Sequence, residues 1–369
     1  PGQVLLAAVV AVLCLIGLVM VLSASSVQAL REDGSSWLYF RRQVLWVLAG
    51  TAALVVAARV DYRRLRRLGV PVLLLAIGLL LLVHVPDLGL TAGGSTRWLG
   101  AGSWRFQPSE LAKLALVLFG ADLLARRATS PDAARAALPP MVLVFLVVGG
   151  LILQQPDLGT TLIAGCVVLC LLLVAGTPLR TMTGLLGTAA AAAFVLGMSE
   201  PYRRERMLSF LNPWADADNT GYQVVQSLVG LGTGRLTGVG VGASRAKWGF
   251  LPNAHTDFIF SIIGEELGLV GSLLVLALFA AFAVLGVRTA LRAPDRYGML
   301  LAVGITAWVT GQAVVNIGAV VGVLPVSGVP LPFVSFGGSS LILLMAAAGV
   351  LLNVAGQGRP PAGARGAAR

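Results

Sequence analysis

The sequence predicts an all-α, polytopic integral membrane protein with about ten transmembrane helices and two long extracellular loops. Of the 369 residues, 57% are hydrophobic and only 12% are charged, and the mean hydropathy is +0.87. A water-soluble enzyme with one hydrophobic core does not have this composition. The apolar residues also do not alternate with polar ones, as they would in the strands of a membrane β-barrel. We therefore treat residues 1–369 as a single membrane domain.

Charged residues, prolines and glycines divide the apolar sequence into segments that are about long enough to cross a bilayer. The first segment has neither a cationic head nor a cleavage signal, so we interpret it as a retained span and not as a signal peptide. The expected spans lie near residues 4–22, 43–58, 69–85, 109–125, 138–154, 157–175, 180–198, 258–287, 298–322 and 338–354. The polar sequence at 154–157 is either a hairpin or a kink in one long bent helix. A kink would reverse the orientation of every later span.

Cationic residues indicate the orientation, because short loops rich in Lys and Arg stay on the cytoplasmic side of a membrane. With ten spans, 15 of the 27 Lys and Arg residues fall on one side, including five Arg between residues 59 and 67. This side is therefore assigned to the cytoplasm, together with the tail 355–369. The long loops 86–108 and 199–257 then lie outside. The other twelve cations are mostly in these outer loops, where an anionic ligand is one explanation for them.

Cysteines and histidines are too few and too dispersed for a metal or disulfide framework. Cys14, Cys166 and Cys170 all fall within apolar spans, where we interpret them as packing residues. His84 and His255 are the only histidines, so a zinc site is not expected.

Asp257 is the most informative polar residue, because it directly precedes the apolar run from Phe258 to Val287. Two interpretations are open. An Asp at a helix start accepts hydrogen bonds from the free N–H groups of the first turn and lies at the positive end of the helix dipole. Alternatively, the carboxylate is held at the membrane surface, where a lipid-linked substrate would present its polar head group.

Four polar clusters share the outer face with Asp257. They are the glycine-rich and cationic segment 203–247, the paired segments 93–98 and 107–113, the segment 154–160, and the segment 331–340. Each alone is explained by a loop or a helix boundary; Ser109 and Glu110 suit a helix start, and Glu110 and Lys113 form an i,i+3 pair. Their convergence on one face of the membrane indicates a binding site.

Two weaker motifs occur in the second outer loop. Glycines recur at 230, 232, 234, 238, 240 and 242 between cationic residues. Such a series can turn backbone N–H groups inward as an anion-binding nest, although a flexible surface loop is the favoured interpretation. Asp216 and Asp218 match the DxD metal signature of nucleotide-sugar transferases, but without an α/β domain we expect a turn there.

Together these segments resemble the SEDS (shape, elongation, division and sporulation) family, which includes RodA and FtsW. The resemblance covers essentially the whole chain and is carried by 97–98, 107–113, 155–160, 221–223 with 226–227, 251–260 with Glu265 and Glu266, and 330–340. It implies a bacterial enzyme that polymerises lipid II into glycan strands on the outer face of the cytoplasmic membrane during cell elongation and shape maintenance. Neither end of the chain carries a long extension, which favours the RodA type over the FtsW type.

The resemblance also implies the partners of the protein. These are lipid II and the nascent glycan strand, a class B penicillin-binding protein that crosslinks the strands, the elongation machinery and membrane lipids. Neither an organic cofactor nor nucleic acid is expected.

In this interpretation Asp257 is the catalytic carboxylate, a general base that takes the proton from an acceptor sugar hydroxyl. The leaving pyrophosphate needs positive charge, from Arg97, Lys113 and Lys247 or from a divalent cation such as Mg²⁺ or Mn²⁺. We expect replacement of Lys113 to lower turnover but to leave stability nearly unchanged. The expected substrate-binding residues are Arg97, Glu110, Lys113, Asp157, Lys247, His255, Ser339 and Ser340, and the candidate metal ligands are Asp257, Asp157 and Glu110.

Two other functions stay open. A lipid II flippase or another transporter would also have many spans and intramembrane acids such as Glu265 and Glu266, although its polar residues should line a route between the two faces. A noncatalytic scaffold for the crosslinking enzyme would not need Asp257. Glu265 and Glu266 either serve the function or pair with a neighbouring span. Gln312 and Asn316 are expected to hold helices together or to bind a partner span.

Overall fold

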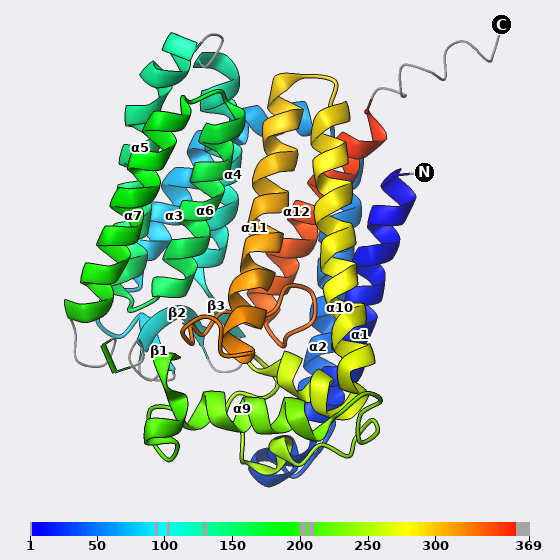
Figure 1. The fold of residues 1–369 in the computed structure, drawn as a ribbon. Helices are drawn as coiled ribbons and strands as arrows, with labels where there is room; N and C mark the ends of the chain where they lie inside the picture. The colour runs from blue at the N-terminus through cyan, green and yellow to red at the C-terminus, as the bar shows by residue number, and fades with distance from the viewer. Residues whose placement is uncertain are drawn as a thin grey trace, which may run out of the picture.

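The computed structural model describes residues 2–92, 95–101, 104–127, 131–199, 204–205 and 210–358. In this part of the chain, ten long helices run roughly parallel to one another and form the bundle in Figure 1. They are α1 (Gly2–Asp33), α2 (Leu38–Arg59), α3 (Gly69–Leu82), α4 (Pro108–Arg127), α5 (Pro131–Gln154), α6 (Leu158–Val174), α7 (Leu179–Ser199), α10 (Ile259–Arg292), α11 (Arg296–Val320) and α12 (Gly338–Gly356). Each coincides with one predicted span, so the predicted fold class is confirmed.

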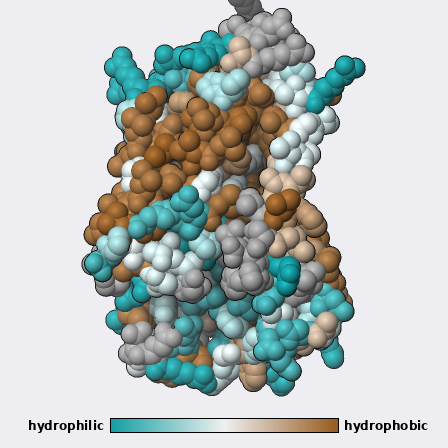
Figure 2. Space-filling view, turned by 90° about the vertical axis from the view of Figure 1, so that its left-hand side faces the viewer, coloured by the Kyte–Doolittle hydropathy of each residue, from teal (hydrophilic) through white to brown (hydrophobic). Residues whose placement is uncertain are grey.

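The surface of this bundle is suited to a lipid bilayer. Among the described residues, seven helices are long and apolar enough to cross a membrane, and α6 and the apolar part of α7 are somewhat shorter. The remaining bundle helix, α4, carries ionisable residues at both of its ends. Figure 2 shows a broad hydrophobic band across one side of the molecule, with hydrophilic residues above and below it. The chain is therefore a multi-pass membrane protein, with α11 and α12 as its most buried spans.

The fifth and sixth spans form a hairpin, which resolves the alternative left open by the sequence. A Cβ on Gly149 of α5 would lie 3.5 Å from Thr161 of α6, and one on Gly165 of α6 would lie 3.2 Å from Phe145 of α5. The contact between the two helices thus runs antiparallel. Pro156 offers no N–H group to continue α5, and the Asp157 side chain accepts from the Thr160 N–H and so begins α6.

The hairpin places the Arg-rich segments that indicated the cytoplasmic side, as far as the structure describes them, at one end of the bundle. The short helix η1 (Tyr62–Leu68), the end of α4, the α10–α11 connection and the end of α12 lie together at the top of Figure 1. The three strands and the segment before α10 lie at the opposite end. This distribution agrees with the orientation derived from the cationic residues.

Both predicted outer loops contain regular structure that the sequence analysis missed. The first forms a three-stranded antiparallel sheet of β1 (Gly89–Ala92), β2 (Ser95–Ala101) and β3 (Trp104–Phe106), in that order. The second contains η2 (Pro213–Asp216), α9 (Tyr222–Thr233) and η3 (Ala246–Trp248). The strands are short, and their stability depends on pairing with one another, so hydropathy gives little signal for them. Within the predicted tail, residues 359–369 lie outside the described residues.

Candidate functional site

Asp257 lies just ahead of α10 and is not its N-cap. The helix begins at Ile259, and its N-cap is Phe258, which makes no side-chain capping bond. The N-cap position that one interpretation gave to Asp257 is therefore taken by the next residue, Phe258. Its backbone is instead held from α11, because the Asn316 side-chain nitrogen donates to the Asp257 carbonyl at 2.7 Å.

A small cavity of about 10 Å³ lies beside Asp257. Asp257 and Asn316 line it together with the loop that joins α11 to α12, including Ser327, Gly328 and Val329. Gly328 has φ +67°, a backbone conformation that disfavours other residues. A Cβ at this position would lie 3.7 Å from both Arg97 Nη1 and Asp257 Oδ2. The guanidinium group of Arg97 and the carboxylate of Asp257 thus flank Gly328 closely.

Arg97 is held in place by Asp157. The Arg97 Nη1 atom lies 3.4 Å from Asp157 Oδ2, and the Gln107 side chain donates to the same oxygen at 3.3 Å. The other oxygen of Asp157 accepts from the Thr160 backbone at 3.0 Å and caps α6. One carboxylate therefore performs both roles that the sequence suggested, a helix cap and a part of the site. Asp157 is buried, whereas Arg97 is partly exposed.

Glu110 and Lys113 are completely enclosed by the protein. Lys113 Nζ donates to Glu110 Oε1 at 2.8 Å and to Gln312 Oε1 at 2.7 Å, and it lies 5.2 Å from the centre of the Trp308 ring. Their side chains are 0% and 1% exposed, so neither contacts a ligand directly in this conformation. The pair joins α4 to α11 beneath the outer surface.

Ser339 and Ser340 connect the start of α12 to the same network. The Ser340 hydroxyl donates to Glu110 Oε2 at 3.0 Å, and Ser339 Oγ accepts from the Gln107 backbone at 3.2 Å. Both serines are buried. In this conformation their hydrogen bonds join the start of α12 to the start of α4.

His255 has an aromatic environment. Its ring centre lies 4.8 Å from that of Tyr39 on α2 and 5.7 Å from that of Phe336, and its carbonyl accepts from the Phe336 N–H at 3.0 Å. These contacts brace the segment that carries Asp257 against α2 and the α11–α12 loop.

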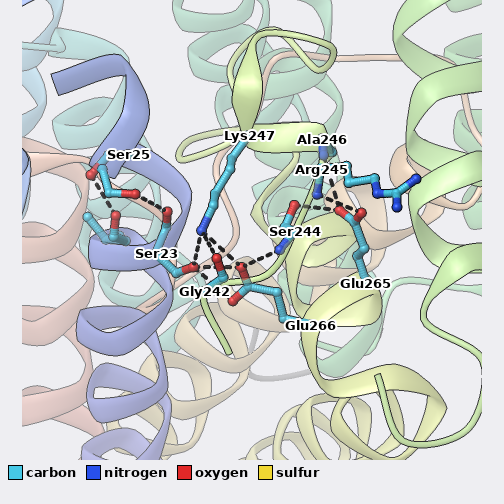
Figure 3. Close-up of polar contacts among 11 residues, drawn as sticks. Ser23, Ser25, Gly242, Ser244, Arg245, Ala246, Lys247, Glu265 and Glu266 are labelled. Atoms are coloured by element: carbon cyan, nitrogen blue, oxygen red, sulfur yellow. Dashed lines mark hydrogen bonds and ion pairs between the residues drawn. The ribbon is translucent and has the colours of Figure 1, made fainter. Parts of the chain in front are cut away.

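Lys247 belongs to a second polar cluster, drawn in Figure 3. It lies 3.6 Å from Glu266 and also donates to Ser23 of α1 and to the Gly242 carbonyl. The Ser23 hydroxyl in turn donates to Glu266 at 2.6 Å. Glu266 lies nine residues beyond Asp257, which corresponds to about 13 Å along α10 at a rise of 1.5 Å per residue. Lys247 therefore binds well away from Asp257. Lys247 thus pairs with Glu266 and not with Asp257.

Backbone N–H groups just after the glycine series also bind an acid of the protein itself. The backbone N–H groups of Arg245 and Ala246 donate to the Glu265 carboxylate at 2.9 and 3.3 Å, and the Ser244 hydroxyl donates to it as well. Glu265 and Glu266 are therefore paired acids, as one of the two sequence interpretations proposed. Their partners come mainly from the loop before α10 and only partly from the neighbouring span α1.

The glycine series is explained by a break in α10 at Gly268, whose φ is +68°. The carbonyls of Glu265 and Glu266 accept from Val239 and Gly240, and the N–H groups of Leu269 and Val270 donate to the carbonyls of 235 and 236. An extended segment is thus inserted into the helix and satisfies the hydrogen bonds that the break exposes. A Cβ at Gly234 or Gly238 would clash with the α10 backbone.

The metal prediction is not supported by the geometry. Among the described residues, no group of three or more His, Cys, Asp or Glu side chains is placed to hold a metal ion. Glu110 binds Lys113 and Ser340, whereas Asp157 binds Arg97, Gln107 and the start of α6. Asp257, Asp157 and Glu110 therefore do not form a ligand set.

Asp216 forms the turn that the sequence predicted and not a metal site. The Asn219 side chain and the Thr220 backbone N–H both donate to its carboxylate, at 2.9 and 3.1 Å. These hydrogen bonds lower the pKa of Asp216 below its ordinary value.

The residues that the sequence analysis did not assign to the site are Asn316, Ser327 and Gly328. Asn316 stood out only as one of two amide residues four positions apart in an apolar span. Its spacing predicts a helix face that makes polar contacts, but nothing in the sequence says that the contact is Asp257.

Comparisons with known proteins assign the chain to a family. It matches the model of the FtsW, RodA and SpoVE family, described as a cell cycle protein, over residues 3–359. It is 42% identical over 351 residues to a probable peptidoglycan glycosyltransferase FtsW of Geobacter metallireducens, covering 95% of this chain and 93% of that protein.

Two solved structures are also similar. One comes from work on the structural coordination of polymerization and crosslinking by a peptidoglycan synthase complex, with a TM-score of 0.77, 32% identity, and 95% of this chain and 96% of that chain covered. The other is a mutant of the rod shape determining protein RodA of Thermus thermophilus, with a TM-score of 0.71, 29% identity and coverage of 96% and 97%. The chain therefore belongs to the FtsW, RodA and SpoVE family, the SEDS proteins.

Proposed function

We propose that this enzyme joins lipid II units into glycan strands on the outer face of a bacterial cytoplasmic membrane. The chain is a peptidoglycan glycosyltransferase, as its curated relatives are. The observation that supports the proposed chemistry is the placement of both the Asp257 carboxylate and the Arg97 guanidinium group beside Gly328. A base and a cation side by side suit a reaction in which a hydroxyl loses a proton and a phosphate leaves.

The proposed reaction is a single displacement. The oxygen of an acceptor sugar hydroxyl forms a bond to the anomeric carbon of the donor, and the bond from that carbon to the lipid pyrophosphate breaks. The hydroxyl proton passes to the Asp257 carboxylate, and the pyrophosphate leaves with the bonding electron pair. Arg97 stabilises the negative charge of the leaving group, and Asp157 orients Arg97 through their ion pair. No step is assigned to a metal, because the carboxylates predicted to bind one do not form a ligand set.

The proposed orientation places Asp257 outside the cell. The Arg-rich ends of the bundle would face the cytoplasm, since short cationic loops are retained there. The carboxylate then meets the head group of a lipid-linked substrate in the outer leaflet. This supports a polymerase more than a flippase, because Asp257 directly precedes α10, at the end of the bundle where the strands lie, and not along a route through it.

We expect a cysteine at Ala217 to react with an impermeant thiol reagent that is added to intact cells. A cysteine at Ala133, at the start of α5, should not react until the cells are opened. A cysteine at Ser103, which lies outside the described residues, should behave like the one at Ala217. The native cysteines lie within α1 and α6, so the unsubstituted protein is the background control. Protection of Ala217 with labelling of Ala133 would place Asp257 in the cytoplasm and contradict external polymerisation.

The proposal includes a class B penicillin-binding protein as the partner, because one similar structure comes from a complex that couples polymerization and crosslinking. Purified protein, with and without this partner, should convert lipid II into glycan strands that a gel separates by length. Movement of lipid II across vesicle membranes without strand formation would instead support the flippase.

The cellular process is a further part of the proposal. The sequence prediction was elongation, whereas the identity of 42% to an FtsW and 29% to a RodA favours division. Depletion distinguishes the two roles. Loss of an elongation enzyme should give rounded cells that still divide, and loss of a division enzyme should give filaments without septa.

A further inference from the structure

Asn316 and Gln312 lie one turn apart on α11 and differ in whether their side-chain oxygen has a hydrogen-bond partner. Both donate to the α11–α12 loop, Gln312 to the Pro330 carbonyl at 2.9 Å and Asn316 to the Val329 carbonyl at 2.7 Å. The side-chain oxygen of Gln312 accepts from Lys113 and from Trp308. The side-chain oxygen of Asn316 has no hydrogen-bond partner among the described residues.

The orientation of the Asn316 amide is fixed by its neighbours. Its nitrogen donates to two carbonyl oxygens, those of Asp257 and Val329, each at 2.7 Å. An oxygen in that position would meet two acceptors, so the nitrogen must face them and Oδ1 must face the other way. Asn316 is only 2% exposed. An unpaired acceptor at this depth destabilises the protein unless another group donates to it.

A second residue with an unpaired group lines the same cavity. Ser327 Oγ is buried and has no partner among the described residues, and Ser327, Asn316 and Asp257 all line the cavity beside Gly328. Two unpaired oxygens next to the proposed base are unusual, because buried polar groups are generally satisfied. The cavity volume of about 10 Å³ accommodates one oxygen-sized group and excludes a sugar ring.

The chemistry of the lining defines what this group is. Asn316 Oδ1 and the Asp257 carboxylate only accept hydrogen bonds, and the Ser327 hydroxyl either donates or accepts. The missing group is therefore a donor, and a single hydroxyl suits it, because it donates its one proton to Asn316 Oδ1 and accepts from the Ser327 hydroxyl. A sugar with neighbouring hydroxyls supplies two such donors from one ring.

We propose that this cavity is a subsite for the acceptor sugar. One ring hydroxyl enters it, donates to Asn316 Oδ1 and accepts from Ser327, while the neighbouring nucleophilic hydroxyl donates to Asp257. Asn316 thus both fixes the backbone of the base and positions the nucleophile. This inference rests on the proposed function, since it needs Asp257 to act on an acceptor hydroxyl.

Ser327→Ala is the sharpest test, because this hydroxyl makes no bond within the described structure whose loss would destabilise the protein. We expect kcat/KM for lipid II polymerisation to fall at least tenfold, with an unchanged or slightly raised melting temperature. Thr177→Val is the matched control. Thr177 also has a buried, unpaired hydroxyl, but it lies at the opposite end of α6, so both quantities should stay at their wild-type values.

Asn316→Ala adds a second measurement. It should lower both kcat/KM and stability, because two backbone carbonyls lose their donor. If Asn316 and Ser327 bind the same hydroxyl, the double variant should lose less kcat/KM than the product of the two single losses.

Wild-type kcat/KM in Ser327→Ala, with Asp257→Asn inactive, would mean that the cavity holds only a resident water, and it would overturn the subsite. An active Asp257→Asn variant would overturn the proposed function itself. The two failures are therefore distinguishable.

Discussion

Asp257→Asn is expected to abolish detectable polymerisation of lipid II by the purified enzyme. An amide cannot take a proton from the acceptor hydroxyl, and a positioned general base contributes about 10²–10⁴-fold to a rate. The change preserves the size of the side chain and the hydrogen bond from Asn316 to the Asp257 carbonyl. Because Phe258 and not Asp257 is the N-cap of α10, we expect stability to change by less than about 1 kcal/mol.

The measurement is the initial rate of glycan strand formation, together with a melting curve of the same preparation. Asp218→Asn is a suitable control, since Asp218 is an exposed acid in the second outer loop. It should retain the wild-type rate. A folded Asp257→Asn variant with a rate near wild type would reject the role of Asp257 as the base.

Lys113→Gln is expected to destabilise the protein strongly, which reverses the expectation from sequence. Lys113 is fully buried, and its ammonium group is the positive partner of the buried Glu110 carboxylate. Removing one member of a buried pair leaves an uncompensated charge and costs about 3–5 kcal/mol. Gln312 would also lose one of the two donors to its side-chain oxygen. Thermal melting in detergent and the yield of folded protein measure this loss.

The double variant Lys113→Met with Glu110→Gln separates stability from catalysis. It removes both charges together, so most of the lost stability should return. If the pair only supports the fold, the folded double variant should polymerise lipid II normally. If the charge of Lys113 also stabilises the leaving pyrophosphate, turnover should fall at least tenfold, equivalent to about 1.4 kcal/mol. A double variant as unstable as Lys113→Gln would contradict the ion-pair explanation.

The ten bundle helices could be predicted from the sequence because hydropathy acts residue by residue, whereas the orientation stays a prediction from charge. Each apolar side chain contributes its own transfer free energy to a span, and each Arg near a span end contributes to orientation. The choice between a hairpin and a kink at 154–157 needed the packing of Gly149 against Thr161, because a proline after a polar pair is compatible with both.

The sequence also placed Asp257, Arg97 and Asp157 on one face of the membrane, and the structure brings all three close to one another. Asp157 and Asp257 directly precede α6 and α10, so the spans place these two at the same end of the bundle, whereas Arg97 is brought to them by strand β2. The two outer loops were less predictable. Their strands and short helices depend on pairing and packing with distant segments and not on a local apolar run.

Only the tertiary structure decided which polar groups are partners. Lys247 suggested a site for an external anion, but it pairs with Glu266 and donates to Ser23. The glycine series left an anion nest open as the less favoured interpretation, but the N–H group of Gly240 donates to the Glu266 carbonyl of α10. Asn316 suggested a contact between helices, but it holds the backbone of Asp257. The physical reason is that hydropathy is a property of single residues that can be summed along a chain. A hydrogen bond is a property of two atoms that the fold must bring within about 3 Å of each other.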